Sequence, residues 1–519
     1  MSRAIIFKDV WYRYPRVDRW ALRDFSIKID YEECVLIVGP SGSGKSTFIF
    51  LARGLHKQFG GELKGTIKLH GKSMSDLDFR EITRMGVGWV GQNPALNLHQ
   101  LTVYDEILSS PIYFNLPWDE CERIARDMMK KLRIMHLADR APSELSGGQM
   151  QRVAIAAALT MGEIGGERKI LLLDEPSSFL DPVGKEELVN LLSELKGEGA
   201  TMVIVTHDIQ TFLELADRMI LIADGRKILE GDPDSVVRSE ELDRTVGAPL
   251  SVKIEKNELL KKQVRARLER PADKAAEEPA IVLRDVHFEY PDQKVFEGLS
   301  CEIPRGRITA LIGNNGSGKT TLVKLALGLL KPQRGKIMLL GKNPVSYSAK
   351  ELASKVSYIT QIPSDMFIAN TVREECGITP RELGVEKVDE VVENALQVSG
   401  LKKLEDASVD SLSGGEQRLL TLACTAFVTD AELLVLDEPE YGVDPNRWWQ
   451  MFKIFEDLKG RGKTIVMLTH FMDATIFCDH IIVLADGRIV DEGSPAEVYR
   501  RDRIKEARIK PPALLPPLP

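Results

Sequence analysis

Three features that would place the chain in other protein classes are scarce or absent in its 519 residues. The six cysteines are scattered with no Cys-x-x-Cys pair, so neither a disulfide framework nor a zinc-binding pattern is indicated. No apolar run approaches the roughly 18 residues of a spanning helix, and the N-terminus lacks the apolar segment of a signal peptide. The net charge of −8 gives no basic footprint for nucleic acid. We therefore expect buried, unpaired cysteines, no membrane-spanning segment and no nucleic-acid partner.

A nucleotide-binding motif occurs twice. The copies Gly39-Pro-Ser-Gly-Ser-Gly-Lys-Ser46 and Gly313-Asn-Asn-Gly-Ser-Gly-Lys-Thr320 both match G-x-x-x-x-G-K-[ST] in full. Each is followed, in the same order, by a Gln, a Leu-Ser-Gly-Gly, an apolar run that ends in Asp-Glu-Pro, and a Thr-His. Because the spacing of these motifs changes little between the copies, the sequence indicates an internal duplication of one domain.

The duplication divides the chain into four parts. We expect a first domain over residues 1–245, a charged linker over 246–279, a second domain over 280–505 and a Pro-rich tail over 506–519. The mixed charge of the linker favours a tether, with a short solvated helix as the alternative. Continuous apolar runs at 170–173 and 433–436 are typical of central strands in a sheet covered on both faces, which indicates the α/β class.

The Gly-rich loops predict where phosphate binds. Glycines let backbone N–H groups wrap phosphate oxygens at the start of a helix. We expect Lys45 and Lys319 to reach the outer phosphates, and the hydroxyls of Ser46 and Thr320 to bind Mg²⁺. The expected ATP contacts in these loops are Gly39, Ser41, Gly42, Gly44, Lys45, Ser46, Thr47, Gly313, Asn315, Gly316, Gly318, Lys319, Thr320 and Thr321.

Two adjacent carboxylates end an apolar strand in each copy. Asp174 and Asp437 are placed to hold Mg²⁺, while Glu175 and Glu438 follow directly and are placed to polarise the attacking water. A solvated strand end is the alternative, but it does not explain why both copies continue in the same way.

The Leu-Ser-Gly-Gly segments predict helix starts. In Ser146-Gly147-Gly148-Gln149 and in Ser413-Gly414-Gly415-Glu416, a Ser is followed three residues later by Gln or Glu, which is a capping box. A helix cap alone is one interpretation. A second anion-binding helix N-terminus, with glycines that allow close approach of a phosphate, is the other.

These motifs, in this order, resemble those of ATP-binding cassette ATPases. The resemblance covers nearly all of both halves of the chain. The resemblance implies two P-loop domains, each with a mainly parallel sheet core, an antiparallel β part and a helical subdomain. It also implies head-to-tail pairing, in which Lys45 shares one ATP with Ser413 and Lys319 shares the other with Ser146.

The same resemblance assigns further roles. It implies that Gln92 and Gln361 sense the metal and the water near a membrane partner. It also implies that His207 and His470 act as a switch at the γ-phosphate. Tyr14 and Tyr290 resemble the aromatic residue that stacks on adenine, with Tyr12 and Phe288 as alternatives. Where the family has a small residue, the second copy has Glu440, which suggests that the two sites differ.

The first half most resembles the ATPases of energy-coupling factor transporters, which import vitamins and metal ions. The resemblance implies an integral membrane coupling subunit, a small substrate-binding membrane subunit and a location on the cytoplasmic face of the membrane. An ATPase of a sugar or peptide importer and a soluble tandem protein acting on ribosomes are the alternatives. A chromosome or repair ATPase would need long heptad arms between the Gly-rich loop and Leu-Ser-Gly-Gly, and the sequence has none.

Overall fold

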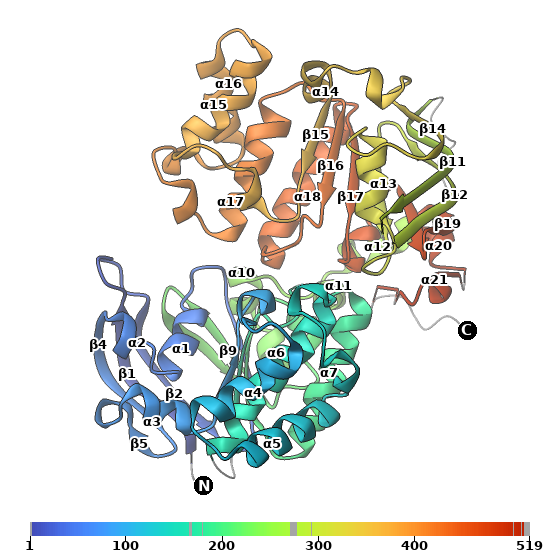
Figure 1. The fold of residues 1–519 in the computed structure, drawn as a ribbon. Helices are drawn as coiled ribbons and strands as arrows, with labels where there is room; N and C mark the ends of the chain where they lie inside the picture. Colours follow the sequence, from blue (N-terminus) through green and yellow to red (C-terminus); the bar gives the residue numbers. More distant parts are fainter. Residues whose placement is uncertain are drawn as a thin grey trace. The chain divides into compact units, whose positions relative to one another are not determined.

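The computed structural model describes residues 3–165, 169–178, 180–269, 278–291, 293–501, 503–509 and 511–512. The chain forms two compact units, Met1–Pro249 and Leu250–Pro519 (Figure 1). Each unit has a mainly parallel sheet, a smaller antiparallel sheet and a group of helices, so the predicted α/β class with two P-loop domains is confirmed.

The first unit begins at β1 and ends after α10. Its elements are β1 (Arg3–Arg13), β2 (Leu22–Asp30), β3 (Cys34–Val38), α1 (Lys45–Ala52), α2 (His56–Phe59), β4 (Glu62–Leu69), β5 (Lys72–Ser73), α3 (Phe79–Arg84), β6 (Val87–Val90), α4 (Val103–Tyr113), α5 (Trp118–Lys131), α6 (Gly147–Gly165), β7 (Ile170–Asp174), α7 (Pro182–Gly197), β8 (Thr201–Val205), α8 (Ile209–Phe212), β9 (Arg218–Ala223), β10 (Arg226–Gly231), α9 (Pro233–Val237) and α10 (Glu240–Thr245).

The second unit begins with two additional helices and then follows the same order, without described counterparts of α2 and β5. Its elements are α11 (Leu250–Lys256), α12 (Glu258–Glu269), β11 (Pro279–Tyr290), β12 (Gln293–Pro304), β13 (Ile308–Ile312), α13 (Lys319–Ala326), β14 (Arg334–Leu339), α14 (Ala349–Lys355), β15 (Val356–Ile359), α15 (Val372–Leu383), α16 (Val388–Val398), α17 (Gly414–Leu422), β16 (Leu433–Asp437), α18 (Pro445–Gly460), β17 (Thr464–Leu468), α19 (Met472–Thr475), β18 (His480–Ala485), β19 (Arg488–Gly493), α20 (Pro495–Val498) and α21 (Arg503–Glu506).

The larger sheets have the same strand order. In the first unit the order is β10-β9-β3-β8-β7-β6, and in the second it is β19-β18-β13-β17-β16-β15, with only the β9–β10 and β18–β19 pairs antiparallel. Every residue of β3, β8, β13 and β17 is buried, as expected of parallel strands with helices on both faces. The carboxyl ends of β3 and β7 lead into the Gly-rich loop and the Asp-Glu pair, so the parallel order brings these motifs to one edge.

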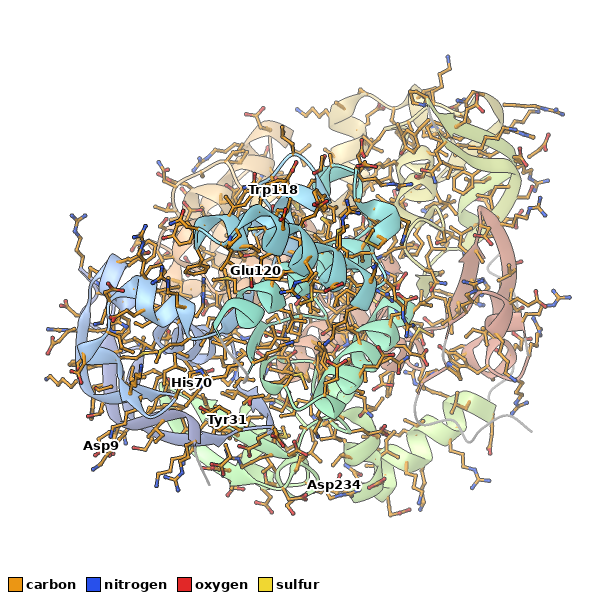
Figure 2. All side chains as sticks on the ribbon, turned by 60° about the horizontal axis from the view of Figure 1, so that its bottom comes forward. Asp9, Tyr31, His70, Trp118, Glu120 and Asp234 are labelled. Atoms are coloured by element: carbon orange, nitrogen blue, oxygen red, sulfur yellow. The ribbon has the colours of Figure 1, made fainter. Side chains whose placement is uncertain are left out.

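The antiparallel sheets, β2-β1-β4-β5 and β12-β11-β14, form a separate layer in each unit. Figure 1 shows β1, β2 and β4 on one side of the first unit and the α4–α5 pair away from them. Tyr31, in the turn after β2, lies beside His70, in the turn after β4 (Figure 2), and its hydroxyl is 2.6 Å from His70 Nδ1. This contact ties together two turns at one end of the layer.

The segment expected as a tether, or as a short solvated helix, instead forms two helices that pack against the core of the second unit. Leu250, Ile254 and Val264 from α11 and α12 are buried in the core cluster that includes Trp448. Arg267 donates to the carbonyl of Phe477 at 2.6 Å. A helix with one apolar stripe is stabilised by such packing even where charged residues dominate its composition. Residues 270–277 lie outside the described part of the chain.

The start of the expected tail is also packed. Ala507 and Ile509 are buried in the same core as Ile504 of α21, and the Ala507 carbonyl accepts a hydrogen bond from Asn314 Nδ2 at 2.8 Å. Residues 513–519 lie outside the described residues. All six cysteines are buried and unpaired, as expected. Over the described ranges, no helix has both the length and the apolar character needed to cross a membrane.

Candidate nucleotide-binding sites

Both Gly-rich loops end in a left-handed glycine that starts a helix. Gly44 has φ 105° and precedes α1, and Gly318 has φ 104° and precedes α13. A Cβ atom at Gly44 would lie 2.7 Å from the Ala21 carbonyl oxygen, so this position requires glycine for both its conformation and its surroundings. The first N–H groups of α1 and α13 are therefore presented at the end of a buried strand, where a phosphate is stabilised.

The two loop lysines lie folded onto their own loops. Lys45 Nζ donates to the carbonyls of Gly39 at 2.7 Å and Pro40 at 3.0 Å. Lys319 Nζ makes the same pair of bonds, to Gly313 at 2.7 Å and Asn314 at 3.1 Å. Both side chains are buried, so each ammonium is already held over the space that the loop encloses.

The strand-end aspartates lie beside the loop hydroxyls. Thr320 Oγ1 donates to Asp437 Oδ2 at 3.2 Å. In the first unit, burial and the nearby charge of Glu175 raise the pKa of Asp174 to about 6. Asp174 Oδ1 is buried without a hydrogen-bond partner among the described residues. A hydroxyl and a buried carboxylate with a spare oxygen are suitable ligands for Mg²⁺, which retains water and phosphate oxygens as its other ligands. No group of three or more His, Cys, Asp or Glu side chains in the described ranges forms a metal cluster by itself.

Each predicted catalytic glutamate lies beside the predicted switch histidine. His207 Nδ1 is 2.8 Å from Glu175 Oε2, and His470 Nε2 is 2.9 Å from Glu438 Oε1. Burial alone would raise the pKa of each glutamate, but the adjacent histidine and the loop lysine lower it. Both glutamates are therefore ionised at neutral pH, which is the state a general base needs.

The two predicted sensor glutamines differ in their hydrogen bonds and in their exposure. Gln361 Nε2 donates to Glu438 Oε2 at 2.6 Å. Gln92 is exposed and makes no hydrogen bond within the described part of the chain. Only the second unit thus joins its sensor glutamine to the catalytic glutamate.

The Leu-Ser-Gly-Gly segments start α6 and α17, as the capping boxes predict. Ser146 N donates to Gln149 Oε1 at 3.0 Å, and Gln149 N donates to Ser146 Oγ at 3.3 Å. Ser413 N and Oγ donate to Glu416 at 2.8 and 2.6 Å, and Arg447 donates to Ser413 Oγ at 3.0 Å. The equivalent of Arg447 in the first unit is a glycine, so only the second serine has this cationic neighbour.

The aromatic candidates separate by burial. Tyr12 is fully buried and donates to the Gly60 carbonyl, and Phe288 is also buried, so these two alternatives belong to the core. Tyr14 Oη lies 3.2 Å from Thr47 Oγ1, and Tyr290 Oη lies 3.4 Å from Thr321 Oγ1. Tyr14 and Tyr290 are thus each attached to the helix that begins at a loop lysine.

Comparison with known proteins accounts for this twofold arrangement. The family model described as "ABC transporter" matches residues 22–178 and 296–440. The chain belongs to the ABC transporter family. A putative ABC transporter ATP-binding protein of Methanosarcina acetivorans is 31% identical, over 100% of this chain and 89% of that protein. The chain is an ABC ATPase, an enzyme that hydrolyses ATP.

Two further similarities concern the whole ABC ATPase chain. A putative HMP/thiamine import ATP-binding protein of Bacillus subtilis is 29% identical, over 99% of this chain and 95% of that protein. The structure of an archaeal ribosome recycling factor in complex with a ribosomal stalk protein matches with a TM-score of 0.62 and 22% identity, covering 96% of this chain and 92% of that one. The second similarity shows the shared fold alone.

The first ABC unit has a pocket of about 460 Å³. Its lining comes from the end of α1 and from α3, β6, α4 and α6: Arg53, Phe79, Ile82, Val87, Gln100, Ser109, Ser110, Tyr113, Phe114 and Met161. Large apolar side chains are exposed nearby in the sequence, namely Leu96, Leu101, Ile112, Tyr113 and Trp118, of which Figure 2 labels Trp118 at the start of α5.

Arg53 is the charged residue of this pocket, and the sequence motifs did not reveal it. Its guanidinium lies 4.0 Å from the centre of the Trp89 ring, and it makes no hydrogen bond or ion pair within the described residues. Burial lowers the pKa of Arg53 to about 10. The second unit has Leu327 at the equivalent position. The only sequence signal is therefore a cation in one copy where the other copy is apolar.

Proposed function

We propose that this ABC ATPase energises a membrane importer of the energy-coupling factor type, which takes up a vitamin or a metal ion. The observation that carries the proposal is the pocket with Arg53, because a partly buried cation without an acidic partner among the described residues is suited to a carboxylate from another protein. The similarity to a relative named for thiamine-related import supports the class of cargo.

We propose that Mg²⁺ is held by Ser46 and Asp174 in one site and by Thr320 and Asp437 in the other. The metal would neutralise charge on the β- and γ-phosphates of ATP. Lys45 and Lys319 release their loop carbonyls and bind the outer phosphates, and Tyr14 and Tyr290 offer a flat face to adenine.

Hydrolysis follows from the strand-end glutamates. Glu175 and Glu438 accept the proton of the attacking water as general bases. His207 and His470 hold these carboxylates and contact the γ-phosphate. We further propose that ATP draws the two units together, so that the helix start at Ser413 completes the Lys45 site and the one at Ser146 completes the Lys319 site.

The membrane partner is proposed to dock in the Arg53 pocket. The occupant is a short helix of an integral membrane coupling subunit that carries an apolar face and one acidic side chain. The carboxylate pairs with Arg53, and the apolar face covers the exposed side chains of α4 and of the segment before it. Closing and opening of the units on ATP binding and release would then move that helix, because only a ligand with different affinities for the two states transmits work. The chain would thus lie on the cytoplasmic face of the membrane.

Co-purification after mild detergent extraction tests this function. The proposal predicts a small integral membrane partner that is lost in the Arg53→Glu variant and retained in the matched Arg226→Glu variant, since Arg226 is an exposed arginine on β10. Recovery of ribosomal particles instead, unaffected by Arg53→Glu, would support the ribosome-acting alternative and contradict the proposal.

A further inference from the structure

The loop that carries the switch histidine is held by a different carboxylate in each unit. In the first unit, Glu175 Oε2 accepts hydrogen bonds from Thr206 Oγ1 at 3.0 Å and from His207 N at 3.2 Å. The acceptor is therefore the predicted catalytic glutamate. Thr206 is fully buried, so its hydroxyl requires a partner inside the protein.

In the second unit, Glu440 takes this position. Its Oε1 accepts from Thr469 Oγ1 at 2.7 Å, from His470 N at 2.7 Å and from Phe471 N at 3.2 Å. Thr469, like its counterpart in the first unit, is fully buried. One oxygen of Glu440 thus satisfies the donors that the catalytic glutamate satisfies in the other unit.

The two units also differ at two further pairs of equivalent positions, Ser177 and Glu440, and Asp208 and Phe471. Ser177 stands where the second unit has Glu440, and Ser177 Oγ donates to Asp208 Oδ2 at 3.2 Å. Lys185 Nζ donates to the same oxygen at 2.6 Å. The second unit has Phe471 in place of Asp208, and this ring packs edge-on against Trp448 with centroids 5.7 Å apart. The first unit thus has a carboxylate on the switch loop, at Asp208, whereas the second unit has one on the segment after the catalytic glutamate, at Glu440.

The consequence for Glu438 is direct. Because Glu440 accepts the switch-loop donors, Glu438 Oε2 is available to Gln361 Nε2 at 2.6 Å, and Glu438 Oε1 lies 2.9 Å from the His470 ring. Glu175 has no such contact with Gln92 in the described structure. The catalytic carboxylate of the second unit thus faces the sensor glutamine, whereas that of the first unit is bound to its switch loop.

We infer that Glu440 is a positioning residue that keeps Glu438 directed towards Gln361 and makes the second site the faster of the two at hydrolysis. This inference rests on the proposed catalytic role of Glu438. Without Glu440, the buried Thr469 hydroxyl and the His470 amide lose their acceptor, and the Glu438 carboxylate, which lies 2.9 Å from the His470 ring, can replace it. Glu438 would then adopt the arrangement that Glu175 has in the first unit.

Steady-state ATPase assays of the full chain test the inference. In a Glu175→Gln background, in which turnover comes from the second site, Glu440→Ser is expected to lower kcat about tenfold with less than a twofold change in KM for ATP, because Glu440 binds no nucleotide. Glu440→Gln is the conservative variant, since its amide oxygen still accepts from Thr469 and His470, and it should retain most of the activity. In a Glu438→Gln background the loss caused by Glu440→Ser should disappear. Thermal unfolding of each variant identifies any that fails to fold.

The outcomes are separable. If Glu440→Ser reduces kcat equally in both backgrounds, or if Glu440→Gln is as slow as Glu440→Ser, the positioning role is wrong. If kcat does not change in either background, it is also wrong. Failure of the catalytic roles themselves would appear elsewhere, as undiminished hydrolysis by the Glu175→Gln, Glu438→Gln double variant.

Discussion

Replacing Arg53 with leucine, the residue found at this position in the second unit, should make the isolated chain more stable while weakening its binding to a partner. Burial lowers the pKa of Arg53 from its ordinary value to about 10. At about 1.4 kcal/mol for each pKa unit, the buried charge costs roughly 3 kcal/mol. Stacking of the guanidinium on the Trp89 ring at 4.0 Å offsets roughly 1–2 kcal/mol of that cost. The net gain expected for Arg53→Leu is therefore about 1–2 kcal/mol.

The lowered pKa of Arg53 decides whether Arg53→Leu raises or lowers the stability of the chain. A cation whose folded-state pKa is lowered carries its full cost below that pKa, so the destabilisation is present at pH 7 and starts to decrease only above about pH 10, where the folded state loses this proton before the unfolded state does. Urea denaturation of the wild type and of Arg53→Leu at pH 7, followed by tryptophan fluorescence, measures the difference. Arg226→Leu, which removes an exposed arginine, should change stability by less than about 0.5 kcal/mol.

Two results would refute this reasoning. One is a loss of stability of more than about 1 kcal/mol in Arg53→Leu, which would mean that the guanidinium has a stabilising partner. The other is undiminished recovery of the membrane partner with this variant, which would mean that the pocket is not the docking site. A more stable chain that no longer retains its partner is the expected combination, since binding sites commonly keep features that cost stability.

Three further predictions concern the nucleotide sites. Burial alone would raise the pKa of Asp208, but the Lys185 ammonium and nearby hydrogen bonds hold this pKa at about 2. Asp208→Asn should therefore lower the free energy of unfolding by about 2 kcal/mol at pH 7. In urea denaturation, the difference in stability from wild type should shrink between about pH 4 and pH 2, and a constant difference would contradict this prediction. Gly44→Ala forces a side chain into φ 105° and 2.7 Å from a carbonyl oxygen, so ATP titration should show at least about tenfold weaker binding in that unit. Glu175→Gln and Glu438→Gln should each lower turnover, and full turnover in either variant would show that the altered site contributes nothing.

The sequence was sufficient for the parts of the fold that depend on local pattern. The apolar runs at 170–173 and 433–436 lie within β7 and β16, and both Gly-rich loops start a helix as expected. These features follow from periodicity and from conformations that only glycine adopts readily, so they can be recognised one segment at a time.

The remainder depended on contacts between distant segments. The charged composition of 250–269 concealed the few apolar residues that bury α11 and α12 against the second unit. The role of Glu440 requires the neighbouring Thr469, which is distant in sequence, and the exposure of Gln92 depends on the path of its loop. Over the described ranges Arg53 has no ion-pair partner, and this depends on segments that are distant in sequence.

The central proposal is that each ATP site is completed by the Leu-Ser-Gly-Gly helix of the other unit. The most direct measurement is ATP turnover of chains in which only the Lys45 site is active, through Glu438→Gln, with either Ser413→Arg or Ser146→Arg added. The account predicts that Ser413→Arg abolishes the remaining turnover, while Ser146→Arg reduces it far less. Loss of turnover through Ser146→Arg, with Ser413→Arg still active, would contradict it.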